Sequence, residues 1–146
     1  MGNRKKVNII NMSFGTTMNS EVLHKAIKDA YEEGILIVAS AGNNGSAIEY
    51  PAAYDEVMAV GSVDSNGKLS TTSARGEELE IVAPGESVKS TGSFGGNVFV
   101  SGTSISVPHI VGVASILWEK DKNCSNEFIR ELQLYFQFQE VHFSQA

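Results

Sequence analysis

The segment with the clearest chemical potential is residues 101–109, which read SGTSISVPH. Ser104 precedes an apolar stretch, so we expect it at the start of a buried helix. A hydroxyl in that position gains from the helix dipole when it becomes a partial anion, which suits a nucleophile. The alternative is that Ser104 or Thr103 only caps the helix, and the spacing leaves both interpretations open. We expect Pro108 in the first helical turn, because its missing N–H needs no partner there.

A second candidate is Asn43, which stands in the segment IVASAGNNG at residues 37–45. The apolar half of this segment predicts a buried strand that delivers the asparagine into a loop bounded by glycines. A side-chain amide placed there can donate a hydrogen bond to a developing oxyanion, an effect worth about 3–4 kcal/mol in the transition state. The alternative is an ordinary Asn-Gly turn, which the segment alone does not exclude.

Four short apolar runs predict the buried strands that must position these residues. They are residues 7–12, 35–39, 57–63 and 79–83. Between the first two runs, Asn19 or Ser20 can cap an amphipathic helix, and Gly34 can end it. Continuous apolar strands joined by an amphipathic helix indicate a parallel sheet that is covered on both faces.

Two further helices are expected nearer the C-terminal end. One begins near Ser104 and runs to about Glu119 with almost no polar face, so we expect it to be buried on all sides. Ser125 can cap the other, which carries apolar residues at helical spacing up to Phe136. The sequence after Gln137 mixes aromatic and polar residues without a period, and we assign residues 137–146 no structure.

Composition excludes several classes of function. The 146 residues include 11 Lys plus Arg and 17 Asp plus Glu, for a net charge of −6. This balance lacks the basic face expected of a nucleic-acid binder, and no apolar run reaches the roughly 18 residues of a membrane span. Cys124 is the only cysteine and the three histidines lack metal-ligand spacing, so we expect no zinc site. No stretch near residue 1 suits a secretory signal, and the compartment stays open.

Five short motifs follow one another along the chain. They are NMSFG at 11–15, AGNNG at 41–45, YPAAY at 50–54, VAPG at 82–85 and GTSISVPH at 102–109. In this order they resemble the subtilisin-like serine proteases, the subtilases, from about residue 7 to about residue 132. The resemblance implies a three-layer α/β/α fold with a mostly parallel sheet. It also implies an endopeptidase that hydrolyses extended peptide or protein substrates through an acyl-enzyme.

The resemblance further implies a role for each motif. Ser104 corresponds to the nucleophile, and its own backbone N–H and the Asn43 side chain correspond to the oxyanion hole. His109 does not correspond to the general base, and we expect it to be a hydrogen-bonded structural residue. The residues that correspond to the substrate-pairing strand are Ser13, Phe14 and Gly15. Those that correspond to one wall of the primary specificity pocket are Ser40, Ala41 and Gly42.

The resemblance implies no cofactor for the chemistry, but it does imply a site for a structural cation. The carbonyl groups of Ala52, Tyr54 and Val57 resemble a site that holds calcium or a monovalent cation in some members of the family. Pro51 corresponds to a position that often follows a cis peptide bond.

The chain departs from the family pattern in the other two members of the catalytic triad. In the family, the Asp and the His both precede the NMSFG motif, whereas only six residues precede Val7 here. We therefore expect residues 1–146 to be an incomplete catalytic domain without its N-terminal strands, inactive alone because a serine without a base is a poor nucleophile. Strand 7–13 would then be an exposed edge, open to a complementing N-terminal half or to self-association. The alternative is a pseudoprotease fragment that binds extended peptides or a partner chain without turnover.

Overall fold

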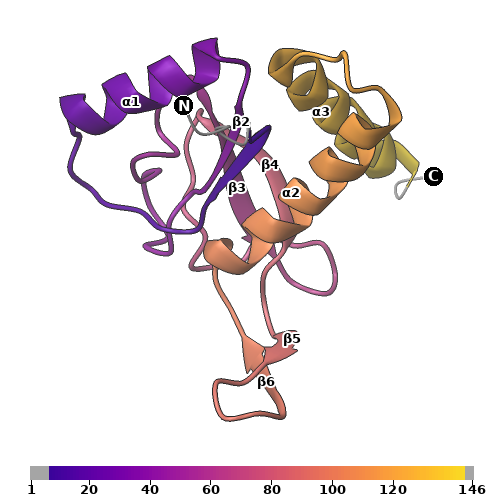
Figure 1. Cartoon of the computed structure of the whole chain (residues 1–146). Coiled ribbons are helices and arrows are strands. Elements are labelled where there is room, and N and C mark those ends of the chain that lie inside the picture. The colour runs from indigo at the N-terminus through magenta and orange to yellow at the C-terminus, as the bar shows by residue number, and fades with distance from the viewer. Residues whose placement is uncertain (1–6, 144–146) are drawn as a thin grey trace.

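The computed structural model describes residues 7–143, with side chains up to residue 137. Figure 1 shows the order of its elements along the chain. They are β1 (Ile9–Met12), α1 (Glu21–Glu32), β2 (Leu36–Ser40), β3 (Val57–Val63), β4 (Leu79–Pro84), β5 (Val88–Thr91), β6 (Asn97–Val100), α2 (Thr103–Lys120) and α3 (Asn126–Phe143). The four predicted strands correspond to β1, β2, β3 and β4.

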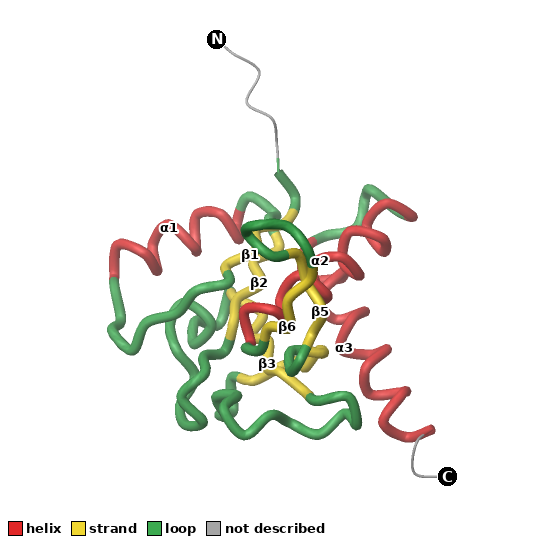
Figure 2. Tube along the Cα trace, turned by 90° about the horizontal axis from the view of Figure 1, so that it is seen from below, coloured by secondary structure: helices red, strands yellow, loops and turns green. Residues whose placement is uncertain are grey.

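The central sheet has the strand order β1-β2-β3-β4, and all its neighbouring strands run parallel. Alternate side chains of β2 point to opposite faces. Leu36 and Val38 join a core cluster with α2 and α3, whereas Ile37 and Ala39 join a second cluster with Ile27 of α1. Figures 1 and 2 show α1 on one side of the sheet and α2 with α3 on the other. The predicted three-layer α/β/α arrangement is confirmed.

The first helix begins and ends where the capping residues predict. The side chain of Ser20 accepts a hydrogen bond from the Leu23 backbone N–H at 3.4 Å, which satisfies one of the donors that a helix start leaves free. Gly34 has a φ of +81°, a left-handed conformation that glycine adopts without a steric penalty. The chain can therefore turn directly from α1 into β2.

Two parts of the C-terminal third differ from expectation. β5 and β6 form an antiparallel hairpin that projects away from the central sheet (Figure 1), although no strand was predicted there. Its strands have four residues each, too few to show a clear alternation. α3 also continues to Phe143, so the prediction of no structure is wrong for residues 137–143. Extending an established helix costs much less than starting one. Residues 144–146 lie outside the described part.

The expectation that α2 is buried on all sides is wrong in part. Its residues Val107 and Ala114 are fully buried against the sheet, but Val113 and Ile116 are 47% and 64% exposed. Only one side of α2 packs on β strands in the described chain, and its opposite side has no covering layer there. Apolar residues occur on all sides of α2, so the sequence pattern alone could not show which side of this helix packs against the sheet.

Within residues 7–143, no helix is long and apolar enough to cross a membrane. The same part of the chain contains no group of three or more His, Cys, Asp or Glu side chains arranged to hold a metal ion.

Candidate active site

Ser104 is the second residue of α2, and the helix begins behind a glycine. The N-cap is Gly102, with a φ of +143° and no side-chain capping bond. Neither Ser104 nor Thr103 therefore acts as the cap, which removes the alternative that the spacing left open. Among the described residues, the half-buried Ser104 hydroxyl makes no hydrogen bond to another group. Its oxygen is available for chemistry.

Asn43 is held in place from the start of α2. Its Oδ1 accepts hydrogen bonds from the Thr103 backbone N–H at 2.8 Å and from the Thr103 hydroxyl at 3.2 Å. Thr103 is fully buried, and its hydroxyl also accepts a bond from the Gly42 N–H at 3.2 Å. An amide whose oxygen is held in this way presents its N–H₂ group on the other side. The sequence argument missed Thr103 as the residue that orients Asn43.

The amide nitrogen of Asn43 and the hydroxyl of Ser104 face the same small space beside Gly102. A Cβ atom on Gly102 would lie 3.3 Å from Asn43 Nδ2 and 3.5 Å from Ser104 Oγ. The two groups were predicted from segments about 60 residues apart, and the fold brings them together. A hydroxyl and an amide N–H₂ group that face one space can attack a carbonyl carbon and donate a hydrogen bond to its oxygen.

Pro108 lies deeper in α2 than predicted. It is the sixth residue of the helix, so it removes a regular helical hydrogen bond. The acceptor that loses its partner is the carbonyl of Ser104, four residues earlier. The Ser13 hydroxyl donates to this carbonyl at 2.9 Å. The prediction that Pro108 lies in the first turn is wrong. The Ser104 carbonyl, which has no helical partner because of Pro108, accepts a hydrogen bond from Ser13 of the predicted substrate-pairing segment.

The predicted substrate-pairing segment and the predicted pocket wall lie side by side. The Ser40 hydroxyl joins the two segments by donating to the Phe14 carbonyl at 3.3 Å. The next residue of the pocket wall, Ala41, is held to β3 by its N–H, which donates to the Val60 carbonyl at 2.9 Å. Phe14 is 56% exposed. Within the described chain, the backbone groups of Gly15 make no backbone hydrogen bond, so they are free to pair with another strand.

His109 lies outside this arrangement. Its Nδ1 is 3.0 Å from the Ile105 carbonyl, four residues earlier on α2. This bond stays within one helix.

Comparison with known proteins places the chain in a family. The Subtilase family model matches residues 3–135. The chain belongs to the subtilase family. The thermostable alkaline protease of Halalkalibacterium halodurans is 44% identical over 126 residues, which cover 86% of this chain and 35% of that protein. Subtilisin DY of Bacillus licheniformis is 43% identical over 129 residues, which cover 85% of this chain and 47% of that protein.

Solved subtilase structures agree with the fold. Sphericase has a TM-score of 0.78 and 37% identity over 84% of this chain and 46% of its own. The psychrophilic protease S41 has a TM-score of 0.78 and 35% identity, with the same two coverages. The chain therefore spans less than half the length of these relatives and adopts the corresponding part of the subtilisin-like α/β fold.

The predicted cation site of this subtilase chain already contains a positive charge. Ala52, Tyr54 and Val57 line one pocket together with Arg130. The Arg130 guanidinium donates to the Val57 carbonyl at 3.2 Å and pairs with the Glu80 carboxylate. Burial lowers the pKa of Arg130, but Glu80 and Tyr31 together raise it more, so the net pKa lies above its ordinary value. Because one of the three carbonyl ligands accepts from a cation of the chain itself, the donor set fits an added metal ion only in part.

Replacing Arg130 with methionine is expected to lower the free energy of unfolding by about 3 kcal/mol, the lower end of the cost of breaking a buried ion pair, because a largely buried Glu80 would lose its partner. The Glu80 and Arg130 side chains are only 20% and 17% exposed. Urea denaturation measures the change. The double variant Arg130→Met with Glu80→Gln is the control and should recover part of the loss, since no unpaired charge remains. A single variant as stable as the unchanged chain would contradict the expectation.

Proposed function

We propose that this chain is the nucleophile-bearing part of a subtilisin-like serine endopeptidase. The observation that carries the proposal is the shared space beside Gly102, which the Ser104 hydroxyl and the Asn43 amide both face. Ser104 Oγ would form a bond to the scissile carbonyl carbon while its proton passes to a base. The C–N bond then breaks, the amine leaves with that proton, and water hydrolyses the acyl-enzyme.

The base is proposed to come from another polypeptide segment. Within residues 7–137, no His, Asp or Glu side chain hydrogen-bonds the Ser104 hydroxyl. The relatives are more than twice as long as the part that this chain matches, and the missing Asp and His would belong to the remainder. Endopeptidase activity would therefore require both parts together.

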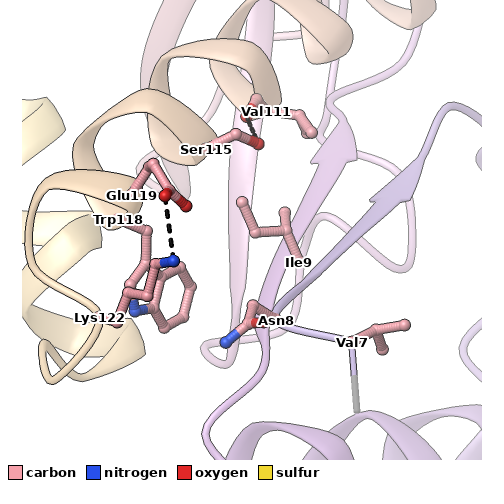
Figure 3. A pocket seen from close by; sticks show the side chains of 8 residues that line it. All are labelled: Val7, Asn8, Ile9, Val111, Ser115, Trp118, Glu119 and Lys122. Carbon is pink, nitrogen blue, oxygen red and sulfur yellow. Dashed lines mark hydrogen bonds and ion pairs between the residues drawn. The ribbon is translucent and has the colours of Figure 1, made fainter. Parts of the chain in front are cut away.

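A groove beside β1 supports this view of the partner. β1 is the edge strand of the sheet, and a groove of about 590 Å³ lies between the start of β1 and α2, with Ile9, Val111 and Trp118 in its walls (Figure 3). The walls also contain the polar side chains of Asn8, Ser115, Glu119 and Lys122. An edge strand beside a groove with both apolar and polar walls is a favourable place for strand addition. We propose that a strand of the complementing N-terminal half pairs with β1, in preference to a second copy of this chain.

Coexpression with the N-terminal half of subtilisin DY tests the proposal. A fluorophosphonate probe is expected to label the chain at Ser104 in the complex and not in the chain alone, because only the complex contains a base. The Ser104→Ala variant should form the same complex without labelling. A folded complex that is not labelled at Ser104 would overturn the proposed activity.

A second candidate is peptide binding without turnover. The free backbone groups of Gly15, and the absence of a base at Ser104 within residues 7–137, favour it. In that case peptide affinity should survive Ser104→Ala, and no complex with a subtilase half should hydrolyse the peptide.

A further inference from the structure

The side chain of Glu49 lies between the predicted substrate strand and the predicted pocket wall. A Cβ atom on Gly15 would lie 2.5 Å from Glu49 Oε2, and one on Gly42 would lie 2.8 Å from both Cγ and Cδ of Glu49. Both distances are shorter than a real Cβ contact allows, so a larger residue at either position would require the Glu49 side chain to move. The Glu49 carboxylate therefore lies next to both Gly15 and Gly42.

The position of Glu49 is fixed from its backbone and from one neighbour. Its N–H donates to the Ala41 carbonyl at 2.8 Å. The Asn44 side-chain amide donates to Glu49 Oε1 at 3.0 Å and to the Ala47 carbonyl at 3.2 Å. A carboxylate offers about four acceptor positions, so one neutral donor leaves most of this capacity unused.

No positive charge of the described chain neutralises Glu49. No Lys, Arg or His within residues 7–137 forms an ion pair with its carboxylate. Arg75 comes from the adjoining loop, but its guanidinium donates to the carbonyls of Gly45 and Ser70. Glu49 is half-buried, and a half-buried carboxylate binds a cationic partner more strongly than a fully exposed one does.

We propose that Glu49 makes this chain selective for a lysine or arginine side chain in an extended peptide that lies along residues 13–15. The location of the peptide rests on the proposed function, whereas the selectivity rests on the position of Glu49. An ammonium or guanidinium at the end of a long aliphatic side chain would reach the carboxylate and form a charge-assisted hydrogen bond. A negatively charged side chain in the same place would be repelled.

Direct binding tests the selectivity without any turnover. Fluorescent hexapeptides that differ at a single residue, either Lys, Arg, Met, Ala or Glu, are titrated into the unchanged chain and followed by anisotropy. Lys and Arg peptides are expected to bind about tenfold more tightly than the Met peptide, which has a similar length without the charge. The difference should shrink at high salt because screening weakens the pair.

Two variants locate the effect. Glu49→Gln keeps the shape and should abolish the preference for Lys and Arg. Glu131→Gln removes the same charge from an exposed position on α3 and should retain it. Equal or tighter binding of the Met or Ala peptide, no saturable binding of any peptide, or an undiminished preference in Glu49→Gln would each overturn the proposal. Labelling of Ser104 reports the proposed chemistry separately, so either idea can fail without the other.

Discussion

Replacing Asn43 with aspartate is expected to slow the acylation of Ser104 by about 10²–10³-fold in the complemented complex, the usual effect of losing one oxyanion-hole donor. Aspartate keeps the oxygen that accepts from the Thr103 N–H and hydroxyl, so the loop should stay in place. It lacks the N–H₂ group that faces the space beside Gly102. The rate of fluorophosphonate labelling at Ser104 measures the loss.

The neighbouring asparagine offers a matched control. Asn44 donates to the Ala47 carbonyl and to Glu49, and we assign it no contact with the reacting carbonyl. Asn44→Asp adds the same charge one residue away. It also replaces the donor to Glu49 with an acceptor, but it should change the labelling rate much less. If the two variants slow labelling equally, the effect is one of charge, and the assignment of Asn43 to the oxyanion hole fails.

Replacing Gly85 with alanine is expected to lower the free energy of unfolding by about 3 kcal/mol, at the upper end of the usual cost of overpacking. The new Cβ would lie 2.2 Å from Ser106 Oγ, 2.6 Å from Ser62 Cβ and 2.9 Å from the Gly102 carbonyl oxygen. These groups belong to α2, to β3 and to the N-cap of α2, so no single flexible side chain can move away. Urea denaturation at an unchanged m-value measures the loss.

Gly85→Ala should also disturb the position of Ser104. The Gly85 carbonyl accepts from the Gly102 N–H at 2.8 Å, and displacing it moves the start of α2 that carries Ser104. Gly112→Ala is the control, because its Cβ would meet nothing within 4 Å in the middle of α2. That variant should gain up to about 1 kcal/mol from helix propensity. Equal stability of Gly85→Ala and the unchanged chain would contradict the packing described here.

Local sequence was sufficient for the elements with strong patterns. The five-residue run of β2 is buried throughout, and Ser20 and Gly34 bound α1 as predicted, because a continuous apolar run and helix-capping residues are both visible in the local sequence. The hairpin of β5 and β6, the exposed side of α2 and the last turns of α3 were not predicted. The exposed side of α2 depends on which surfaces the rest of the fold covers. The hairpin strands are too short to show alternation, and the last turns of α3 extend a helix that is already formed.

For the candidate site as well, some features could be predicted from the sequence and others depend on the tertiary structure. The sequence by itself determined the family, the serine and the asparagine, because short motifs in a characteristic order are a property of the chain alone. Only the tertiary structure decided that Thr103 orients Asn43, that Ser13 bonds the Ser104 carbonyl, and that Glu49 lies between Gly15 and Gly42. The Thr103 and Ser13 contacts join residues 60 and 91 positions apart, and the parallel sheet brings them together by aligning the ends of strands that are distant in sequence.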